Sequence, residues 1–247
     1  MDLIKLNAKN SEELTQKLWG NYEYNDEEHK YWKDGEELIS VTTFISKYFP
    51  KFIQEEQAEA YSQRLLSKGI LKSKEQILKE WDDKREYGTK YHYDIELQLS
   101  NPVCIPPLDT IADSKVREAL QIVIGYTSLF DVVLIYPEVK IIDKELGLAG
   151  TIDLLMITRK GEIILADWKT CNSIYKGEKN NPITPELHDN NYTKYEIQLS
   201  VYSYLIERLG LEVIGTYIFH LKMEGGVVIY PTKYFKEITE VMIYGKA

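Results

Sequence analysis

The second half of the chain alternates between hydrophobic runs of strand character and one strongly amphipathic helical segment. Residues 132–142, 148–158 and 162–169 are rich in β-branched and aliphatic side chains, and only short links separate them. Links this short favour three antiparallel strands in a meander. Residues 192–209 then have apolar positions at helical spacing, and a further strand is expected over 212–221. Because a strand–helix–strand passage crosses over right-handedly, we expect the strands on either side of this helix to be parallel.

The first half of the chain has helical patterns and one hairpin signal. Asp34-Gly35 between two apolar segments predicts the hairpin turn. Ser40 or Thr42 can then cap a short helix that ends before Pro50. Further helices are expected over residues 11–19, 52–71, 73–81, 86–99 and 114–130, the last capped by Ser114, and the chain is expected to end in a helix that starts at Thr232.

This order of elements predicts an α/β fold with a mixed central sheet flanked by helices. The chain has no internal repeat and no linker-like stretch, so we expect a single domain over residues 1–247. Residues 84–247 would form the core of this domain, and residues 1–83 an N-terminal helical and hairpin extension packed on that core.

Two acids and a lysine lie near the ends of the second and third predicted strands. Asp153 belongs to one strand, and Asp167 is followed two residues later by Lys169 in the next. Charged groups are costly inside apolar strands unless they are paired or bind a metal. Two carboxylates brought together by a hairpin repel each other unless a cation lies between them, and oxygen ligands favour Mg²⁺ or Mn²⁺. For Asp167-Trp168-Lys169 alone, the alternative is a surface ion pair of little energetic weight.

Two helical segments contribute further candidates. His92 lies four residues before Glu96, beside an apolar stripe, so it is either a hydrogen-bonded boundary histidine or a ligand with Glu96 behind it. Gln198 interrupts the apolar stripe of the helix over residues 192–209 and precedes Tyr202 by four positions. Core packing is the alternative for Tyr202.

Four segments in this order form a recognisable set: Gly88-Thr-Lys-Tyr-His92, Gly150-Thr-Ile-Asp153, Ile163-Ile-Leu-Ala-Asp167-Trp-Lys169-Thr170 and Glu196-Ile-Gln198-Leu-Ser-Val-Tyr202. The middle two resemble the signature of the PD-(D/E)XK nuclease superfamily. The outer two are similar to the histidine helix and the Q-x-x-x-Y helix of its RecB-like branch, which includes phage exonucleases and the mitochondrial genome maintenance exonuclease. The resemblance implies a restriction-endonuclease-like αβββαβ core.

The resemblance also implies a set of roles. His92, Asp153 and Asp167 would hold Mg²⁺ or Mn²⁺, together with the Trp168 carbonyl, and Glu138 would bind a second metal or a ligand-bound water. Lys169 would orient and help to deprotonate the attacking water, so that Lys169, Asp153 and Asp167 form the catalytic set. Gln198 and Tyr202 would contact the phosphate backbone of the substrate or brace Lys169.

Composition limits how such an enzyme could bind its substrate. A net charge of −9 argues against a protein that coats nucleic acid non-specifically. DNA would therefore have to be held by local cations, for which Lys140, Lys176, Lys179 and Lys194 are candidates. The chain has no signal peptide and no membrane-spanning apolar run, so we expect a cytoplasmic protein. The composition, rich in Lys, Ile, Asn and Tyr, is typical of an AT-rich genome and favours a bacterium or a phage-infected cell as the source.

The expected function is therefore hydrolysis of DNA by a metal-dependent exonuclease in recombination, repair or genome processing. Two alternatives stay open: a nuclease-fold module that binds nucleic acid or protein without cutting, and a structure-specific or restriction-type endonuclease. The sequence leaves the choice between single- and double-stranded DNA open. It also leaves open whether the protein forms a homo-oligomer or has a recombination partner protein.

Overall fold

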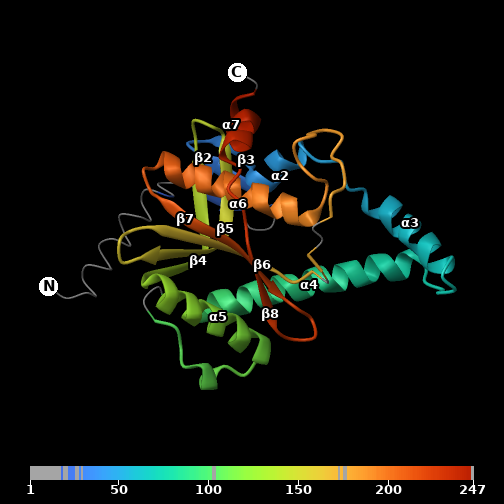
Figure 1. Ribbon diagram of the computed structural model, residues 1–247, viewed down its shortest axis with the longest axis horizontal. Helices are drawn as coiled ribbons and strands as arrows, with labels where there is room; N and C mark the ends of the chain where they lie inside the picture. The colour runs from blue at the N-terminus through green and yellow to red at the C-terminus, as the bar shows by residue number, and fades with distance from the viewer. Residues whose placement is uncertain are drawn as a thin grey trace.

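The computed structural model describes residues 18, 22–25, 28, 30–101, 104–171, 173–174 and 177–245. Apart from Leu18, the helix expected over residues 11–19 lies outside the described residues. The described part of the chain is an α/β structure whose open, mixed, eight-stranded sheet is flanked by helices (Figure 1). None of the helices described is long and apolar enough to cross a membrane.

The elements follow one another in a simple order. The strands are β1 (Glu23–Asn25), β2 (Lys30–Lys33), β3 (Glu36–Ser40), β4 (Val132–Asp143), β5 (Leu148–Thr158), β6 (Ile163–Lys169), β7 (Val213–Leu221) and β8 (Val227–Pro231). The α-helices are α2 (Val41–Ser46), α3 (Gln54–Leu66), α4 (Lys74–Gln98), α5 (Ser114–Phe130), α6 (Asn191–Arg208) and α7 (Lys236–Tyr244), and a 3₁₀ turn covers Leu108–Thr110.

The hairpin near the start forms as its turn residues predict. Asp34 and Gly35 join β2 to β3 with φ values of 52° and 80°, the positive angles that a two-residue type I′ turn requires. Ser40 then caps α2, because its side-chain oxygen accepts a hydrogen bond from the Thr43 amide at 3.1 Å. The cap of α5 differs from the expectation. Asp113 caps this helix instead of Ser114, and its carboxylate accepts a hydrogen bond from the Lys115 amide at 2.8 Å.

The two helices expected over residues 73–81 and 86–99 are in fact one. Helix α4 runs unbroken through 25 residues and begins with a capping box in which the side chain of Ser73 pairs with residue Gln76. Gly88 does not interrupt it. A Cβ atom at Gly88 would lie 2.6 Å from Thr170 Oγ1, so the glycine allows α4 to pass close to the end of β6. The boundary expected between residues 83 and 84 falls within this helix.

The sheet has the expected connections in its central part. Strands β4, β5 and β6 are successive antiparallel neighbours, which confirms the meander. Strand β7 follows α6 and pairs in parallel with β6, with Lys169 opposite His220. The crossover prediction is therefore correct. Strand β3 joins the sheet by a short parallel pairing with the start of β5, where Ile39 lies opposite Leu148.

Helices cover both faces of the sheet (Figure 1). On one face, α2, α6 and α7 bury a core that includes Leu155, Leu165 and Tyr202. On the other, α4 and α5 bury a second core that includes Trp168 and Phe219. Because side chains alternate along a strand, Asp153 and Asp167 continue the row of Leu155 and Leu165 toward the charged end of the sheet. The candidate residues therefore lie where the first core ends.

Tyr202 tests how tightly α6 packs on β5. A Cβ atom at Gly150 would lie 2.6 Å from Cε1 of Tyr202, whose side chain is buried. Gly150→Ala should therefore lower the free energy of unfolding by roughly 1–3 kcal/mol, the usual cost of overpacking. Urea unfolding measures this change. Gly125→Ala is the matched control, because its Cβ in α5 meets nothing within 4 Å. That variant should gain about 0.5–1 kcal/mol from helix propensity, and equal effects at the two positions would contradict the packing argument.

Candidate functional site

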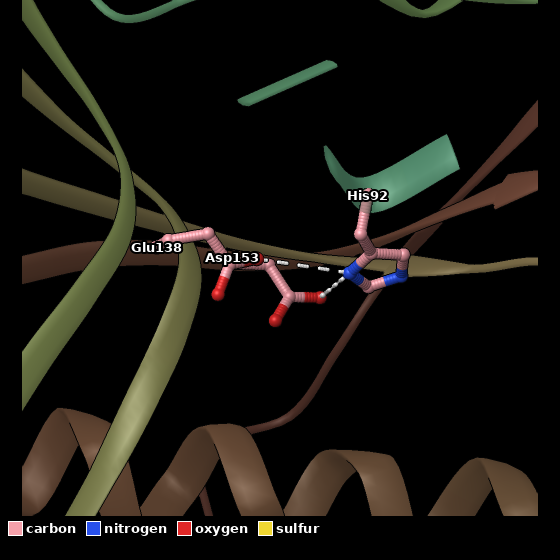
Figure 2. A group of neighbouring side chains, drawn as sticks. All are labelled: His92, Glu138 and Asp153. Carbon is pink, nitrogen blue, oxygen red and sulfur yellow. Dashed lines mark ion pairs between the residues drawn. The ribbon is translucent and has the colours of Figure 1, made fainter. Parts of the chain in front are cut away.

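Three side chains from three separate elements converge at the charged end of the sheet. His92 comes from α4, Glu138 from β4 and Asp153 from β5, and one ligand atom of each lies within 4.8 Å of the others. His92 Nδ1 is 3.6 Å from Asp153 Oδ2 and 3.8 Å from Glu138 Oε1. Figure 2 shows both carboxylates directed toward this nitrogen. One imidazole and two carboxylates so arranged are able to hold a divalent cation.

The strand register places the two carboxylates of this cluster face to face. Pro137 pairs with Leu154 and Val139 with Ile152, so Glu138 and Asp153 lie opposite each other on adjacent strands. Like charges directly opposite are destabilising in a sheet. Glu138 also has a φ of 49°, a left-handed conformation that non-glycine residues adopt at an energetic cost and that tends to occur at functional positions. Both features place Glu138 where it lowers the stability of the strand pair.

The backbone of Trp168 connects His92 with Asp153. His92 Nε2 lies 3.1 Å from the Trp168 carbonyl oxygen, and the Trp168 amide donates a hydrogen bond of 2.9 Å to Asp153 Oδ2. When Nε2–H donates to this carbonyl, Nδ1 is the nitrogen that faces the carboxylates. A metal-binding histidine is commonly oriented by such a hydrogen bond at its second nitrogen.

The charges of this cluster determine the protonation of His92. Burial alone would lower the pKa of His92, but the neighbouring carboxylates of Asp153 and Glu138 outweigh that effect and raise it to about 9. An imidazolium therefore balances the two acids at neutral pH. A cation that binds here would replace a proton, as is usual for histidine ligands.

Asp167 and Lys169 form a second, more deeply buried pair beside this cluster. Asp167 is 3% exposed, and Lys169 Nζ forms an ion pair with its Oδ2. Burial, only partly offset by Lys169, raises the pKa of Asp167 to about 6. Burial would lower the pKa of Lys169, but Asp167 and Asp153 raise it above its ordinary value. Asp167 thus lies next to the three-residue cluster without being one of its members.

The two α6 candidates have different environments. Tyr202 is buried against Gly150, and burial raises its pKa far above the usual value although a hydrogen bond with Gln198 opposes the shift. Gln198 instead lines a cavity of about 560 Å³ between α6 and the segment that follows α2. Tyr202 therefore packs in the core, whereas Gln198 is accessible to a ligand.

A larger cavity of about 770 Å³ opens in front of His92, Glu138 and Lys169. Helix α4 supplies much of its wall. The residues from this helix recur every three or four positions and so share one helix face; they are Trp81, Lys84, Arg85, Gly88, Thr89, His92, Tyr93 and Glu96. The sequence reasoning missed the first three because it divided α4 into two helices, whereas the spacing along one continuous helix would have revealed them.

The structure describes three of the four lysines expected to line a DNA groove, and their surroundings differ. Lys179 and Lys194 both pair with Asp189, at 2.7 and 3.0 Å, so a carboxylate already balances part of their charge. Lys140 lies over the ring of Tyr24 at 4.9 Å from the centroid. Lys176 lies outside the described residues.

Comparisons with known proteins assign the chain to no family. No protein-family model matches the sequence, and no curated protein matches it. A solved structure described as "Crystal structure of SSO0001" aligns over 86% of this chain and 77% of its own, with 15% sequence identity and a TM-score of 0.36. A similarity at this level supports no functional argument.

The contact between α4 and the end of β6 predicts that the effect of Gly88→Ala on stability depends on the residue at position 170. Gly88→Ala should lower the free energy of unfolding by roughly 1–3 kcal/mol, because the new Cβ would lie 2.6 Å from Thr170 Oγ1. In a Thr170→Ala background that oxygen is gone, and the remaining Thr170 Cβ position is 3.8 Å away. There Gly88→Ala should instead stabilise the protein by about 0.5–1 kcal/mol through helix propensity. Urea unfolding of all four variants gives the double-mutant cycle, and additive effects would show that the contact is not tight.

Proposed function

We propose that this protein is a metal-dependent nuclease that hydrolyses phosphodiester bonds of DNA. The observation that carries the proposal is the convergence of His92, Glu138 and Asp153 on one point, at the wall of a cavity that Lys169 also lines. A cation site next to a charged lysine is suited to a reaction in which negative charge develops on a phosphate.

The order of elements supports the same proposal. Helix α5, the antiparallel strands β4, β5 and β6, helix α6 and the parallel strand β7 follow one another along the chain. This is the αβββαβ order that the resemblance to the PD-(D/E)XK nucleases predicts. On this interpretation the fold is a restriction-endonuclease-like core, and α4 brings the additional histidine that the RecB-like branch would use.

The residues present fit a Mg²⁺ or Mn²⁺ ion. Glu138 and Asp153 offer carboxylate oxygens, and His92 offers Nδ1 while its other nitrogen is held by the Trp168 carbonyl. A mixed set of oxygen and imidazole ligands makes Mn²⁺ as acceptable as Mg²⁺. The bound ion would supply Lewis-acid stabilisation of the phosphoryl oxygens. The resemblance made Asp167 a ligand of the first metal and gave Glu138 a secondary role, whereas in the structure Glu138 and not Asp167 joins His92 and Asp153. Asp167 is proposed to act through Lys169.

Lys169 is proposed to act through its charge. Because Asp167 and Asp153 raise its pKa, the ammonium group stays protonated at neutral pH. It is therefore suited to orienting water by hydrogen bonding and to stabilising charge on the phosphate, and less suited to removing a proton. The buried carboxylate of Asp167 positions this ammonium group through their ion pair. Gln198 is proposed to contact the polynucleotide, whereas Tyr202 supports β5 from the core.

Cleavage assays test the proposal directly. End-labelled single- and double-stranded DNA and closed circular DNA are incubated with the protein in Mg²⁺, Mn²⁺ or EDTA. Asp153→Ala and Lys169→Ala should each reduce the rate roughly 10²- to 10⁴-fold, and EDTA should abolish it. Lys68→Ala is the control, because Lys68 is an exposed residue in the turn that follows α3. This variant should cut DNA at the wild-type rate.

The assay also separates the remaining alternatives. If the wild-type protein leaves every substrate intact in both metals, the nuclease proposal is lost and a non-cleaving binding module takes its place. Cutting of closed circles would indicate an endonuclease, whereas degradation limited to DNA with ends supports the exonuclease.

Metal binding can be measured without any substrate. Because a ligand that binds only the folded state stabilises it by RT ln(1 + [L]/Kd), Mn²⁺ at 100 times its Kd should add about 2.7 kcal/mol to the free energy of unfolding. Asp153→Ala should remove this gain. Asp131→Asn is the control. Asp131 is also an acid and pairs with Arg159 at 2.8 Å, but this pair lies at the opposite end of the β4–β5 hairpin from the turn, beyond Val132 and Thr158 and away from the cluster. Equal Mn²⁺ stabilisation of all three proteins would show that the ion binds elsewhere.

A further inference from the structure

An aromatic pair stands at the base of a helical arm. Helix α3 and the first half of α4 lie side by side and extend beyond one end of the sheet (Figure 1); we call residues 52–85 the arm. The rings of Phe52 and Trp81 are in tilted contact, 6.0 Å apart between centroids. Phe52 is nevertheless 64% exposed, so this ring is only partly covered by its neighbour.

The aromatic pair joins two cavities. Trp81 lines the 770 Å³ cavity in front of the His92 cluster, and Phe52 lines the 560 Å³ cavity beside Gln198. A second contact joins the same two walls. Lys169 lines the first cavity and lies 4.7 Å from the ring centroid of Tyr195, which lines the second. The two cavities are therefore neighbours, and Lys169, which lines the first together with His92 and Glu138, lies next to their common boundary.

Each cavity also has one cation with no acidic partner. Lys84 in the first cavity and Lys51 in the second form no salt bridge within the described part of the chain. The other basic residues of the walls are paired: Arg85 with Asp82 at 3.1 Å, Lys194 with Asp189 at 3.0 Å, and Lys169 with Asp167. Lys51 precedes Phe52 in the chain, and Lys84 follows Trp81 by about one turn of α4. In a chain whose net charge is −9, these unpaired lysines next to the aromatic pair are a place where an anionic ligand would be attracted.

We propose that Phe52 and Trp81 form a stacking platform for the bases of a single-stranded polynucleotide, whose phosphates Lys51 and Lys84 contact on either side. The identification of the ligand as a polynucleotide rests on the proposed function. The single-stranded form follows from the rings: bases are available for stacking on side chains only when they are not already stacked in a duplex. A strand bound here would pass from one cavity to the other and across the candidate metal centre.

Binding in EDTA tests this platform without any cleavage. Fluorescence anisotropy measures the Kd for labelled oligodeoxythymidine, oligouridine and a blunt DNA duplex. Phe52→Ala and Trp81→Ala should each weaken single-strand binding roughly 5- to 100-fold, whereas Phe52→Tyr, which keeps the ring, should bind like wild type. Leu71→Ala is the control, because Leu71 is 87% exposed in the arm but belongs to neither cavity. Circular dichroism checks that each variant is folded.

The salt dependence of binding tests the two lysines separately from the rings. Removal of one phosphate contact should reduce the slope of log Kobs against log salt by about 0.7 for a single strand. Lys51→Ala and Lys84→Ala should each show this reduction, and Lys68→Ala should not. An unchanged slope for Lys51→Ala and Lys84→Ala would remove both residues from the proposed strand path.

The outcomes separate this inference from the proposed function. Ring-dependent binding of oligodeoxythymidine or oligouridine supports the platform, and the preferred oligonucleotide identifies the polynucleotide. Ring-dependent binding with no cleavage in Mg²⁺ or Mn²⁺ would overturn the nuclease proposal and leave the platform standing. Cleavage by a protein whose single-strand binding ignores Phe52 and Trp81 would overturn the platform alone. Duplex binding that is tighter than single-strand binding and independent of both rings would also overturn it.

Discussion

The close approach of α4 to the end of β6 is the contact on which the candidate site depends. Gly88 makes it possible, because any larger residue would meet Thr170. One turn further along α4, His92 reaches the Trp168 carbonyl and faces the carboxylates of the neighbouring strands. One turn or two earlier, the same helix face presents Lys84 and Trp81 to the cavity. A single crossing thus sets both the candidate metal ligands and the base of the arm.

The charges at the end of the sheet are stable because they are divided into two groups. Glu138 and Asp153 repel each other across the strand pair, and the His92 side chain balances them at the cavity wall. Asp167 lies deeper and is balanced by Lys169. Asp153 acts on both groups, because its charge raises the pKa of His92 and also that of Lys169. Removing one member of a buried pair would leave an uncompensated charge. The open group is available to a cation, while the buried group holds a lysine in its charged form.

This division gives the proposed nuclease a simple physical basis. A cation at the open group and the Lys169 ammonium would approach a phosphate from neighbouring positions, and preorganised charges of this kind stabilise transition states without further reorganisation. The cavities on either side of Lys169 would extend the binding surface along a strand. The acidic protein would then attract its substrate through a few local cations, and not through its net charge.

The sequence by itself determined the central meander, the crossover helix, the parallel strand after it and the candidacy of His92, Asp153, Asp167, Lys169 and Gln198, because hydrophobic period and local turn chemistry are encoded in neighbouring residues. It could not predict that Gly88 lies inside one continuous helix, since a glycine at a tight crossing and a glycine at a helix end have the same local pattern. Only the tertiary structure decided that Glu138 joins His92 and Asp153 while Asp167 turns to Lys169. That choice depends on strand register and on the burial of each carboxylate, which are properties of residues distant in the chain.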